Sequence, residues 1–334
     1  MQTFGIIGGG AWGTALAQVL RRAGRDVVLW AREAEVVAAI ADTNSNPMFL
    51  PGIKLAAGVR ATHDLAVAAR ADAVLLAAPA QHLRAIAARL APHLAKDVPL
   101  VLCTKGIEEK TGALMSEVAA DAAPDAPLAV LSGPTFAREV AEGMPTAVTL
   151  AAANAALGAD LVAALGGRSF RPYLSSDPIG AQVGGAVKNV LAIACGIVMG
   201  KRFGDNARAA LITRGLAEMV RLAVAKGGRT ETLMGLSGLG DLTLTCTGLQ
   251  SRNLSLGIAL GLGEALDSVL AGRRSVVEGV ASSAACVALA EKLGIEMPIA
   301  QSVDAILHKG ASVEHEIETL LARPFKAELA PGAA

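Results

Sequence analysis

The chain has 334 residues, of which 53% are hydrophobic, and its 30 basic and 30 acidic side chains cancel to a formal net charge of zero. A neutral chain offers no electrostatic case for binding nucleic acid or an anionic membrane surface, so an anionic ligand must be held by a local group of residues. The length is sufficient for two domains, each with its own hydrophobic core.

The N-terminus and the cysteines exclude further classes. The first ten residues, MQTFGIIGGG, contain no positively charged leader, and the longest apolar stretch, 190–200, is shorter than the ~20 residues that span a bilayer. The four cysteines and five histidines show no metal-ligand spacing. We therefore expect a cytoplasmic protein without stable membrane insertion, disulfide or structural metal.

Short apolar segments alternate with helical patterns in the first half of the chain. This alternation predicts an α/β fold in which a parallel, doubly wound sheet of the Rossmann type is covered on both faces by helices. The segments that we interpret as strands are 3–9, 26–31, 72–79, 99–106 and 128–134, and helical periodicity marks, among others, 13–24 and 82–94.

After about residue 180 the alternation stops, and the pattern predicts an all-helical C-terminal domain. Asp177 followed by Pro178 is typical of a helix N-cap and first helical position. We predict a dinucleotide-binding domain over 1–180, a helical substrate-binding domain over 181–325 and a tail over 326–334. The predicted helices are 178–200, 205–227, 252–260, 276–293 and 298–308.

The segment GGGAWG, residues 8–13, matches the dinucleotide fingerprint G-x-G-x-x-G. It follows the first predicted strand and opens a helix, which is the context that the motif requires. Gly8 permits the tight turn, Gly10 lets the backbone approach a pyrophosphate, and Gly13 lets helix and strand pack closely. The alternative, an ordinary strand–helix turn, does not explain this placement at the start of the chain.

The end of the second predicted strand bears on the choice between NADP and NAD. An acidic residue there binds the ribose of NAD, whereas an Arg nearby accommodates the 2′-phosphate of NADP. Arg32 stands at about this position and favours NADP, while Glu33 leaves NAD possible. Arg32 is equally compatible with a solvated surface charge, so the choice stays open.

Two segments follow directly after predicted strands. Lys105 comes after LVLCT, and 132–135 (SGPT) comes after LAVL. In open α/β sheets ligands bind beyond the carboxyl ends of the strands, so both positions point to a shared crevice. The alternative for Lys105 is a lysine that reaches solvent at a strand end.

Lys188 interrupts the apolar helix predicted over 178–200. Gly184 and Gly185 lie on the same helix face and leave a hollow beside its amine. A desolvated lysine has a lowered pKa and can act as a general base. Extension of the side chain to the surface is the alternative.

Residues 235–253, GLSGLGDLTLTCTGLQSRN, are rich in glycine and hydroxyl groups, and we predict a structured loop. Ser251 is placed to cap a helix that begins at Arg252, and with Asn253 these groups suit a phosphate dianion. Asp241 could orient a substrate hydroxyl or hold the lysine. An ordinary capped helix start remains an alternative.

Together these motifs resemble the NAD(P)-dependent glycerol-3-phosphate dehydrogenases. The motifs that carry the resemblance, in family order between residue 5 and residue 324, are GGGAWGTALA, CTKGI, SGPTFA, GGAVKN, DNARAALITRGL, GLSGLGDLTLTCTGLQSRN and VVEGV. The resemblance implies interconversion of dihydroxyacetone phosphate and sn-glycerol 3-phosphate by hydride transfer with NADPH or NADH. It also implies a homodimer, a phosphate-bearing small substrate, no metal, and a supply of precursor for glycerophospholipid synthesis.

The resemblance also implies roles for individual residues. Lys188 matches the general acid/base, and Lys105 and Arg252 match positions that contact both cofactor and substrate. Many relatives carry Ser where Ala11 stands, so a hydroxyl contact to the pyrophosphate is missing here. The other substrate positions are Gly133, Thr135, Asp241, Ser251 and Asn253, and the other cofactor positions are Ala11, Trp12, Arg32, Ala137, Val276 and Glu278.

Two rival functions remain open on the sequence. One is an NADPH-dependent reductase of a hydroxy or keto acid with the same two-domain build, because a carboxylate substrate would also use an Arg such as Arg252. The other is a dinucleotide-binding redox sensor, which needs no proton donor and so leaves Lys188 and Asp241 without a purpose.

Overall fold

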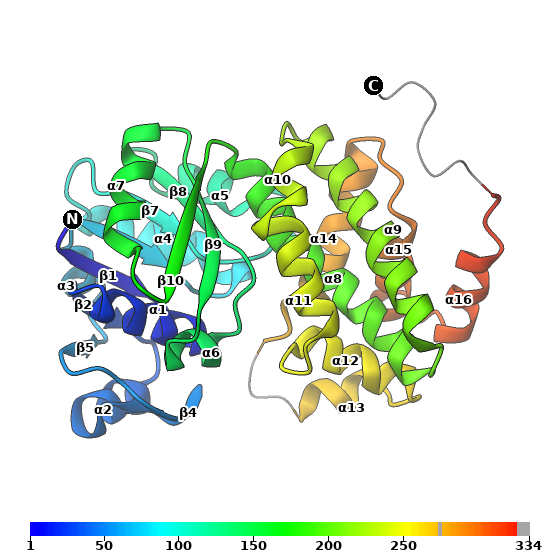
Figure 1. Cartoon of the computed structure of the whole chain (residues 1–334), viewed down its shortest axis with the longest axis horizontal. Coiled ribbons are helices and arrows are strands. Elements are labelled where there is room, and N and C mark those ends of the chain that lie inside the picture. The colour runs from blue at the N-terminus through cyan, green and yellow to red at the C-terminus, as the bar shows by residue number, and fades with distance from the viewer. Residues whose placement is uncertain (273–275, 326–334) are drawn as a thin grey trace.

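The computed structural model describes residues 1–272 and 276–325, so the predicted tail at 326–334 lies outside the described residues. Strands and helices alternate up to residue 175, and helices alone follow from residue 178 within the described part. Figure 1 shows the result as two lobes side by side, one built on a sheet and one helical. The predicted fold class, a Rossmann-type sheet domain followed by a helical domain, is confirmed.

The central sheet has eight strands in the order β10-β9-β8-β7-β6-β1-β2-β5. The chain starts in the middle at β1, builds outward to β5, and then crosses back to β6 on the other side of β1. This reversal creates a crevice at the carboxyl ends of β1 and β6, where open α/β sheets bind ligands. The strands are β1 (Thr3–Ile7), β2 (Asp26–Trp30), β5 (Val59–Thr62), β6 (Ala73–Leu76), β7 (Leu100–Leu102), β8 (Leu128–Ser132), β9 (Thr146–Ala151) and β10 (Phe170–Ser175), with a separate hairpin of β3 (Ser45–Asn46) and β4 (Leu50–Lys54).

Each of the five predicted strand segments contains an observed strand, but the sheet is not parallel throughout. β9 runs antiparallel to β8, and β10 runs parallel to β9. A parallel connection must return the chain along the full length of the sheet, which usually takes a longer helix. The only helix between β8 and β9 has 6 residues, so β9 starts at the same end of the sheet at which β8 finishes, and it runs in the opposite direction.

Helices cover both faces of the sheet, which explains why the strands are apolar on both sides. Ile6 belongs to one hydrophobic core and its neighbour Ile7 to another, as the alternation of side chains along a strand requires. The first core includes residues of α1, α2, α6 and α7, and the second residues of α3, α4 and α5. These helices are α1 (Ala11–Arg22), α2 (Ala34–Thr43), α3 (Leu65–Ala69), α4 (Leu83–Leu90), α5 (Met115–Ala122), α6 (Ala137–Glu142) and α7 (Ala155–Leu165), with short 3-10 turns η1 (Ala80–His82) and η2 (Ala91–His93).

The helical lobe is built around α8 (Pro178–Gly200), whose bounds agree with the prediction. The Asp177 carboxylate accepts a hydrogen bond from the Gly180 amide at 2.9 Å and caps the helix start. By length and composition α8 could cross a membrane, but 89% of its most apolar window is buried inside the fold, so it is a core helix. The helices around it are α9 (Gly204–Ala225), α10 (Thr230–Met234), the π-helical turn η3 (Leu236–Gly240), α11 (Asp241–Thr247), α12 (Arg252–Gly261), α13 (Leu266–Ala271), α14 (Glu278–Lys292), α15 (Pro298–His308) and α16 (Val313–Leu321).

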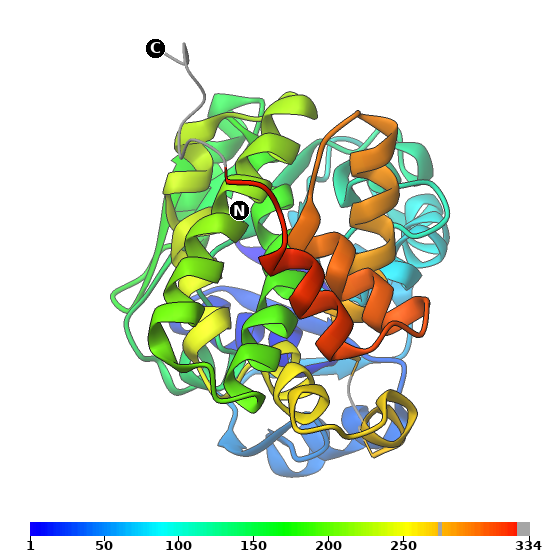
Figure 2. The same cartoon turned by 90° about the vertical axis from the view of Figure 1, so that its right-hand side faces the viewer.

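Figure 2 faces the helical lobe and shows α14, α15 and α16, in orange to red, stacked on one side of it. α14 and α15 both pack on α8 as well as on each other, so α8 is enclosed. The predicted helices over 205–227, 252–260, 276–293 and 298–308 are observed with ends that differ by two residues or fewer.

The prediction of a loop over 235–253 is wrong, because most of this segment is helical. Its glycines serve close packing instead of flexible turns. A Cβ atom on Gly238 would lie 2.0 Å from the Leu233 carbonyl oxygen, and one on Gly184 of α8 would lie 2.2 Å from the Ser237 carbonyl oxygen. Gly238 therefore lets η3 fold back onto α10, and Gly184 lets α8 press directly on η3.

Candidate active site

The predicted dinucleotide fingerprint lies at the turn from β1 into α1. Gly8 has φ +130°, and a Cβ there would lie 2.8 Å from the Ala77 backbone at the end of β6. A Cβ on Gly13 would lie 1.9 Å from the Gly8 carbonyl oxygen, so this turn is closed tightly by backbone alone. By contrast, a Cβ on Gly10 would meet nothing within 4 Å. The turn thus presents open space beside Gly10, which is where a pyrophosphate approaches in this motif.

The start of α1 offers hydrogen-bond donors to such an anion. Its N-cap is Gly10, which provides no side-chain cap, and its first turn holds no acidic residue. The first backbone amides of a helix have no partner within the helix, and the helix dipole favours negative charge there. The Trp12 indole nitrogen is buried and has no hydrogen-bond partner among the described residues, which adds one more unused donor. The residues present therefore fit a dinucleotide.

Arg32 and Glu33 lie directly after β2. The Arg32 side chain is 78% exposed, and its guanidinium contacts the Glu33 carboxylate at 2.8 Å. Among the described residues, no hydrogen bond or ion pair links Arg32 to Lys105, Lys188 or Asp241. The two side chains form an ion pair at the surface just after β2, and both the cation that favours NADP and the anion that favours NAD are present there.

Three charged side chains meet between the two lobes and form what we call the lysine cluster: Lys105, Lys188 and Asp241. The Asp241 carboxylate is fully buried and accepts from both amines, from Lys188 at 2.6 Å and from Lys105 at 2.8 Å. Lys105 comes from the segment after β7, Lys188 from the middle of α8 and Asp241 from the start of α11. The Lys188 side chain is only 8% exposed, so its extension to the surface, the alternative open on sequence, is not what the structure has.

The surroundings of Lys188 set its proton affinity. Burial lowers the pKa of Lys188 to about 8, because the charged form loses its hydration. The negative charge of Asp241 acts in the opposite direction and limits this lowering, while the positive charge of Lys105 adds to it. A lysine in this state exchanges protons near neutral pH, as a general acid or base must.

Thr245, which the sequence prediction left out, completes the surroundings of the amine, and Asn189, whose role it left undefined, links α8 to α12. The Thr245 hydroxyl accepts from Lys188 at 2.8 Å and donates to the Asp241 carbonyl oxygen at 2.6 Å. Asn189 accepts from the Asn253 amide at 2.9 Å. Thr245 stands four residues after Asp241, so it would have been found had the segment been recognised as a helix.

The segment after β8 carries Gly133 and Thr135 to the lysine cluster. Lys105 donates to the Gly133 carbonyl oxygen at 2.8 Å and to the Thr135 hydroxyl at 3.2 Å. Gly133 has φ +151°, and a Cβ there would lie 2.9 Å from the Val148 backbone on β9. Glycine is therefore required for the turn that aims its carbonyl at Lys105.

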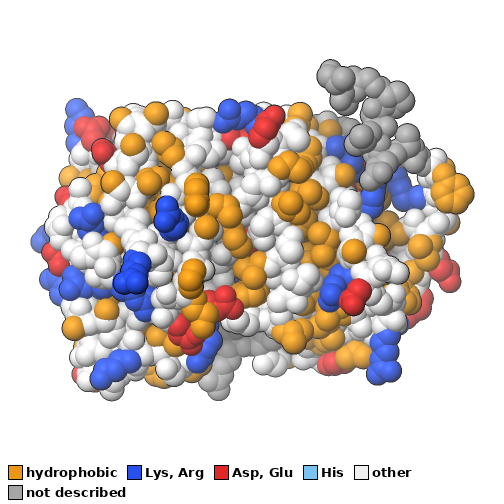
Figure 3. All heavy atoms as spheres, viewed as in Figure 1, with side chains coloured by type: hydrophobic (Ala, Val, Ile, Leu, Met, Phe, Trp, Pro, Cys, Tyr) orange, Lys and Arg blue, Asp and Glu red, His pale blue; other side chains and the backbone are white. Residues whose placement is uncertain are grey.

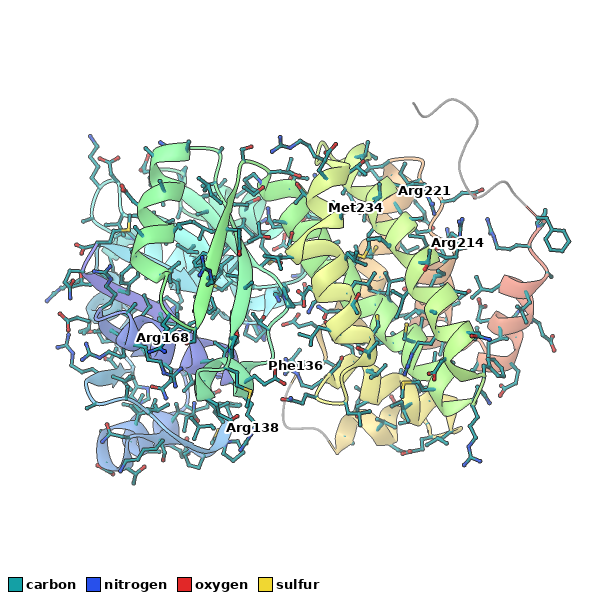
Figure 4. All side chains as sticks on the ribbon, viewed as in Figure 1. Phe136, Arg138, Arg168, Arg214, Arg221 and Met234 are labelled. Carbon is teal, nitrogen blue, oxygen red and sulfur yellow. The ribbon has the colours of Figure 1, made fainter. Side chains whose placement is uncertain are left out.

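The same segment is attached to the helical lobe. Figure 4 shows Phe136 at the side of the sheet lobe that faces the helical one. A Cβ on Gly248 would lie 2.6 Å from two ring carbons of Phe136, so the ring lies against the end of α11. Gln250 donates to the Glu139 carboxylate at 2.7 Å nearby. These contacts connect the start of α6, with Ala137 at its first position, to the loop before α12.

The predicted phosphate group, Ser251, Arg252 and Asn253, lies at the start of α12. The Ser251 hydroxyl accepts from the Leu254 amide at 3.2 Å, as an N-cap does. Arg252 is exposed, whereas Asn253 is buried and links two other elements. Its amide nitrogen donates to Asn189 on α8, and its oxygen accepts from the Gly279 amide of α14 at 3.0 Å. The start of α12 is thus fixed to the helix that carries Lys188.

Val276 and Glu278 lie just before and at the start of α14. Val276 is half exposed, while Glu278 is mostly buried and accepts a long hydrogen bond, 3.4 Å, from the Ala80 amide of the sheet lobe. Burial raises the pKa of Glu278, and the positive charge of Arg252 opposes the change. Glu278 therefore brings the start of α14 to the sheet lobe and lies within the electrostatic reach of Arg252.

A separate hollow opens on the face of the molecule shown in Figure 3, where apolar side chains gather between the lobes. It measures about 410 Å³ and is lined by residues of β9, β10 and the α10–η3 segment, including Tyr173, Leu174 and Thr232. None of the lysine cluster lines it. It is therefore distinct from the site described above.

A glycine-rich turn at the switch point of a sheet, together with a buried lysine held by a carboxylate, defines a dinucleotide-dependent oxidoreductase. Family comparisons resolve the class further. The model of the N-terminal part of NAD-dependent glycerol-3-phosphate dehydrogenase matches residues 3–158, and that of the C-terminal part matches residues 177–318. The chain belongs to this family.

Individual relatives agree over almost the whole chain. It is 59% identical to glycerol-3-phosphate dehydrogenase (NAD(P)+) of Parvibaculum lavamentivorans over 97% of each chain. It is 61% identical to the enzyme of that name from Rhodospirillum rubrum, over 97% of this chain and 93% of that one. The crystal structure of glycerol-3-phosphate dehydrogenase from Coxiella burnetii superposes with a TM-score of 0.93 at 41% identity, covering 96% of this chain and 99% of that one. These relatives do not favour the keto-acid reductase or the redox sensor.

Proposed function

We propose that the chain interconverts dihydroxyacetone phosphate and sn-glycerol 3-phosphate with NADP or NAD. The observation that carries the proposal is Lys188, a lysine buried in a core helix with a pKa of about 8 and held between Asp241 and Thr245. Such a group is costly to bury, and proton transfer to and from a carbonyl oxygen explains its presence.

Lys188 acts as the general acid when the carbonyl is reduced. The reduced nicotinamide supplies a hydride to carbon 2 when it is bound. The Lys188 ammonium donates its proton to the carbonyl oxygen, and in the opposite direction the neutral amine removes the proton of the 2-hydroxyl group. Asp241 and Thr245 hold the amine in place, because both accept from Lys188 Nζ at 2.8 Å or less.

The charge balance of the lysine cluster supports an anionic substrate. Lys105 and Lys188 share one carboxylate, Asp241, so the cluster has an excess of one positive charge when both amines are protonated. We assign the phosphate to the start of α12, with Ser251, Arg252 and Asn253, where backbone amides, the helix dipole and a guanidinium combine. We further assign Lys105, Gly133, Thr135 and Asp241 to substrate positioning.

For the cofactor, we assign the pyrophosphate to the turn from Gly8 to Gly13. The open space at Gly10 and the uncapped start of α1 support this assignment. The remaining cofactor contacts that we propose are Ala11, Trp12, Arg32, Lys105, Ala137, Arg252, Val276 and Glu278.

The proposal includes the organisation and setting of the protein. We propose a dinucleotide-binding domain over 1–180 and a substrate-binding domain over 181–325, with the boundary in the first turn of α8, shortly after the last strand of the sheet. We also propose a cytoplasmic homodimer that supplies glycerophospholipid synthesis, as the resemblance over the whole chain implies. Sedimentation velocity would test the dimer, because a monomer at micromolar concentration contradicts it.

The reaction is tested by following oxidation of NADPH and NADH with dihydroxyacetone phosphate. We expect turnover by the wild type, and a loss of about 10²–10⁴-fold in Lys188→Ala. Lys201→Ala is the matched control, because Lys201 caps the end of the same helix and pairs with Glu314 far from the cluster. Dihydroxyacetone without phosphate and a keto acid serve as competing substrates. Folded wild type that binds NADPH without reducing dihydroxyacetone phosphate contradicts the proposal.

A further inference from the structure

The two helices that carry the proposed reaction groups, α8 and α12, touch backbone to backbone at four glycines. Gly196 and Gly200 on α8 face Gly257 and Gly261 on α12, and all four positions are glycine. A Cβ on Gly196 would lie 2.2 Å from the Leu254 carbonyl oxygen and 2.8 Å from the Gly257 Cα. The contact is reciprocal, since a Cβ on Gly257 would lie 2.0 Å from the Ile193 carbonyl oxygen.

The second pair repeats this geometry one turn further along. A Cβ on Gly200 would lie 2.5 Å from the Ile258 carbonyl oxygen, and one on Gly261 would lie 2.6 Å from the Ile197 carbonyl oxygen. Helices with larger side chains at the contact pack about 8–10 Å apart, so two successive glycine pairs hold α8 and α12 closer than usual. Such a contact has no side chain that can yield, and its spacing is therefore rigid.

Each helix carries one part of the proposed site close to this contact. Lys188 precedes Gly196 by eight residues on α8, about 12 Å at 1.5 Å per residue. Asn253 precedes Gly257 by four residues on α12, about one turn. The hydrogen bond from Asn253 to Asn189 joins the two helices at the level of the site, at 2.9 Å. The separation of the helices thus determines how far the start of α12 lies from the Lys188 amine.

We propose that the glycine contact between α8 and α12 sets the length of substrate that the site accepts. The inference rests on the proposed function, in which Lys188 acts at the carbonyl oxygen and the start of α12 binds the phosphate. In dihydroxyacetone phosphate one methylene group and one ester oxygen separate the carbonyl carbon from phosphorus. Only a fixed distance between the amine and the phosphate-binding amides lets both ends of this short molecule be held at once. Gly196, Gly200, Gly257 and Gly261 are accordingly positioning residues for specificity.

A methyl group at Gly196 changes that distance. Carbon atoms in favourable contact lie about 3.5 Å from their neighbours. Because only 2.2 Å is available at the Leu254 carbonyl, α12 must move away by on the order of 1 Å. A displacement of about 1 Å between reacting groups costs up to about 10²-fold in rate. Gly196 faces the first turns of α12 and Gly200 its end, so the effect is larger at Gly196.

The test compares two substrates in Gly196→Ala, Gly257→Ala and Gly200→Ala. One is dihydroxyacetone phosphate, and the other is 4-hydroxy-3-oxobutyl phosphate, which has one more methylene group between carbonyl and phosphate. We expect kcat/KM for the shorter substrate to fall about 10²-fold in the Gly196 and Gly257 variants, and the preference for it over the longer one to fall about tenfold or more. If Gly196→Ala does not fold, Gly200→Ala, with 2.5 Å available, carries the comparison.

Gly215→Ala is the matched control. Gly215 is a buried glycine of α9 that also packs on α8, where a Cβ would lie 2.8 Å from the Leu191 side chain. Its replacement disturbs the same central helix without touching α12. We expect a lower melting temperature in all variants but an unchanged substrate preference in Gly215→Ala.

The outcomes separate the inference from the proposed function. No turnover of dihydroxyacetone phosphate by the wild type refutes the function itself. If the wild type is active, and Gly196→Ala, Gly257→Ala and Gly200→Ala all keep its substrate preference, the inference is overturned but the proposed function is not. Inorganic phosphate should raise the melting temperature of the Gly196 variant as much as that of the wild type, because the start of α12 is intact. Loss of that effect would mean that the glycines maintain the phosphate site itself, and it also overturns the inference.

Discussion

Replacing Asp241 by Asn tests the electrostatics of the lysine cluster. The Asp241 carboxylate is fully buried and accepts from Lys188 at 2.6 Å and from Lys105 at 2.8 Å. Asparagine has nearly the same shape but no charge, so the two amines face each other without a counter-charge. We expect the pKa of Lys188 to fall further below its ordinary value, since an opposite charge at this distance contributes about 1–3 to a pKa.

The magnitude follows from linkage. At about 1.36 kcal/mol for each unit of pKa, the Lys188 contribution to the cost of Asp241→Asn is roughly 1.4–4 kcal/mol of unfolding free energy. The full cost applies below the lowered pKa of Lys188 in the variant, and it shrinks as pH rises from there to about 8, the wild-type pKa of Lys188. Unfolded lysine keeps its proton up to about pH 10.4. The lower folded pKa therefore makes the stability of the variant rise more steeply with pH, and this part of the cost vanishes above about pH 9.

Urea unfolding followed by circular dichroism, at about pH 6.5 and about pH 9, measures the difference. Asp177→Asn is the control, because Asp177 is a buried carboxylate that accepts from backbone amides of Gly180 and Arg229 at 2.9 Å each. Its cost should be the same at both pH values. An Asp241→Asn cost that is equal at the two pH values, or larger at the higher one, would refute the reasoning.

Four further variants test other parts of the molecule. Gly10→Ala places a methyl group in open space and should weaken NADPH binding about tenfold at an unchanged melting temperature, measured by fluorescence titration and calorimetry. In Gly13→Ala the new methyl group meets the Gly8 carbonyl at 1.9 Å and should lower the melting temperature. The reverse pattern would contradict the assignment of the pyrophosphate to the turn from Gly8 to Gly13. Burial raises the pKa of Glu218 from 4.5 to about 7, so wild-type stability should fall by about 3 kcal/mol as pH rises through this window, and urea titrations of Glu218→Gln should lack that fall. Arg252→Ala should raise the KM for dihydroxyacetone phosphate about 10–100-fold, and at saturating NADPH it should lower the turnover of unphosphorylated dihydroxyacetone much less. Equal losses with both substrates would argue against a phosphate contact.

The sheet lobe could be predicted well where a local rule determines the structure. A strand that is followed by G-x-G-x-x-G and then by a helix adopts one characteristic turn. Gly8, Gly10 and Gly13 have the environments that this turn requires. The bounds of α8 were equally accessible, because Asp177 and Pro178 mark its start. Antiparallel pairing of β9 was not accessible, since it depends on which edge the chain reaches after a six-residue helix and not on the strand residues themselves.

The helical lobe shows where local patterns fail. Glycines at 235, 238 and 240 are typical of a loop, yet the segment is helical: Gly238 allows η3 to pack on Leu233 of α10, and Gly184 of α8 allows α8 to press on η3. Whether such glycines belong to a loop or to a close helix contact depends on the helix that packs against them, and that helix is distant in the chain. The same error hid Thr245, whose hydroxyl reaches Lys188 because α11 is a helix. The assignment of single residues to substrate and cofactor remains a prediction.

The central claim is that Lys188 is the general acid and base, and the pH dependence of kcat/KM in both directions tests it most directly. We expect reduction of dihydroxyacetone phosphate to slow, and oxidation of sn-glycerol 3-phosphate to accelerate, as pH rises through about 8, the pKa of Lys188. The ammonium is needed in one direction and the neutral amine in the other, so the two profiles must have opposite slopes with a common midpoint. Slopes of the same sign, or an unchanged pair of profiles in Lys188→Ala, would contradict the account.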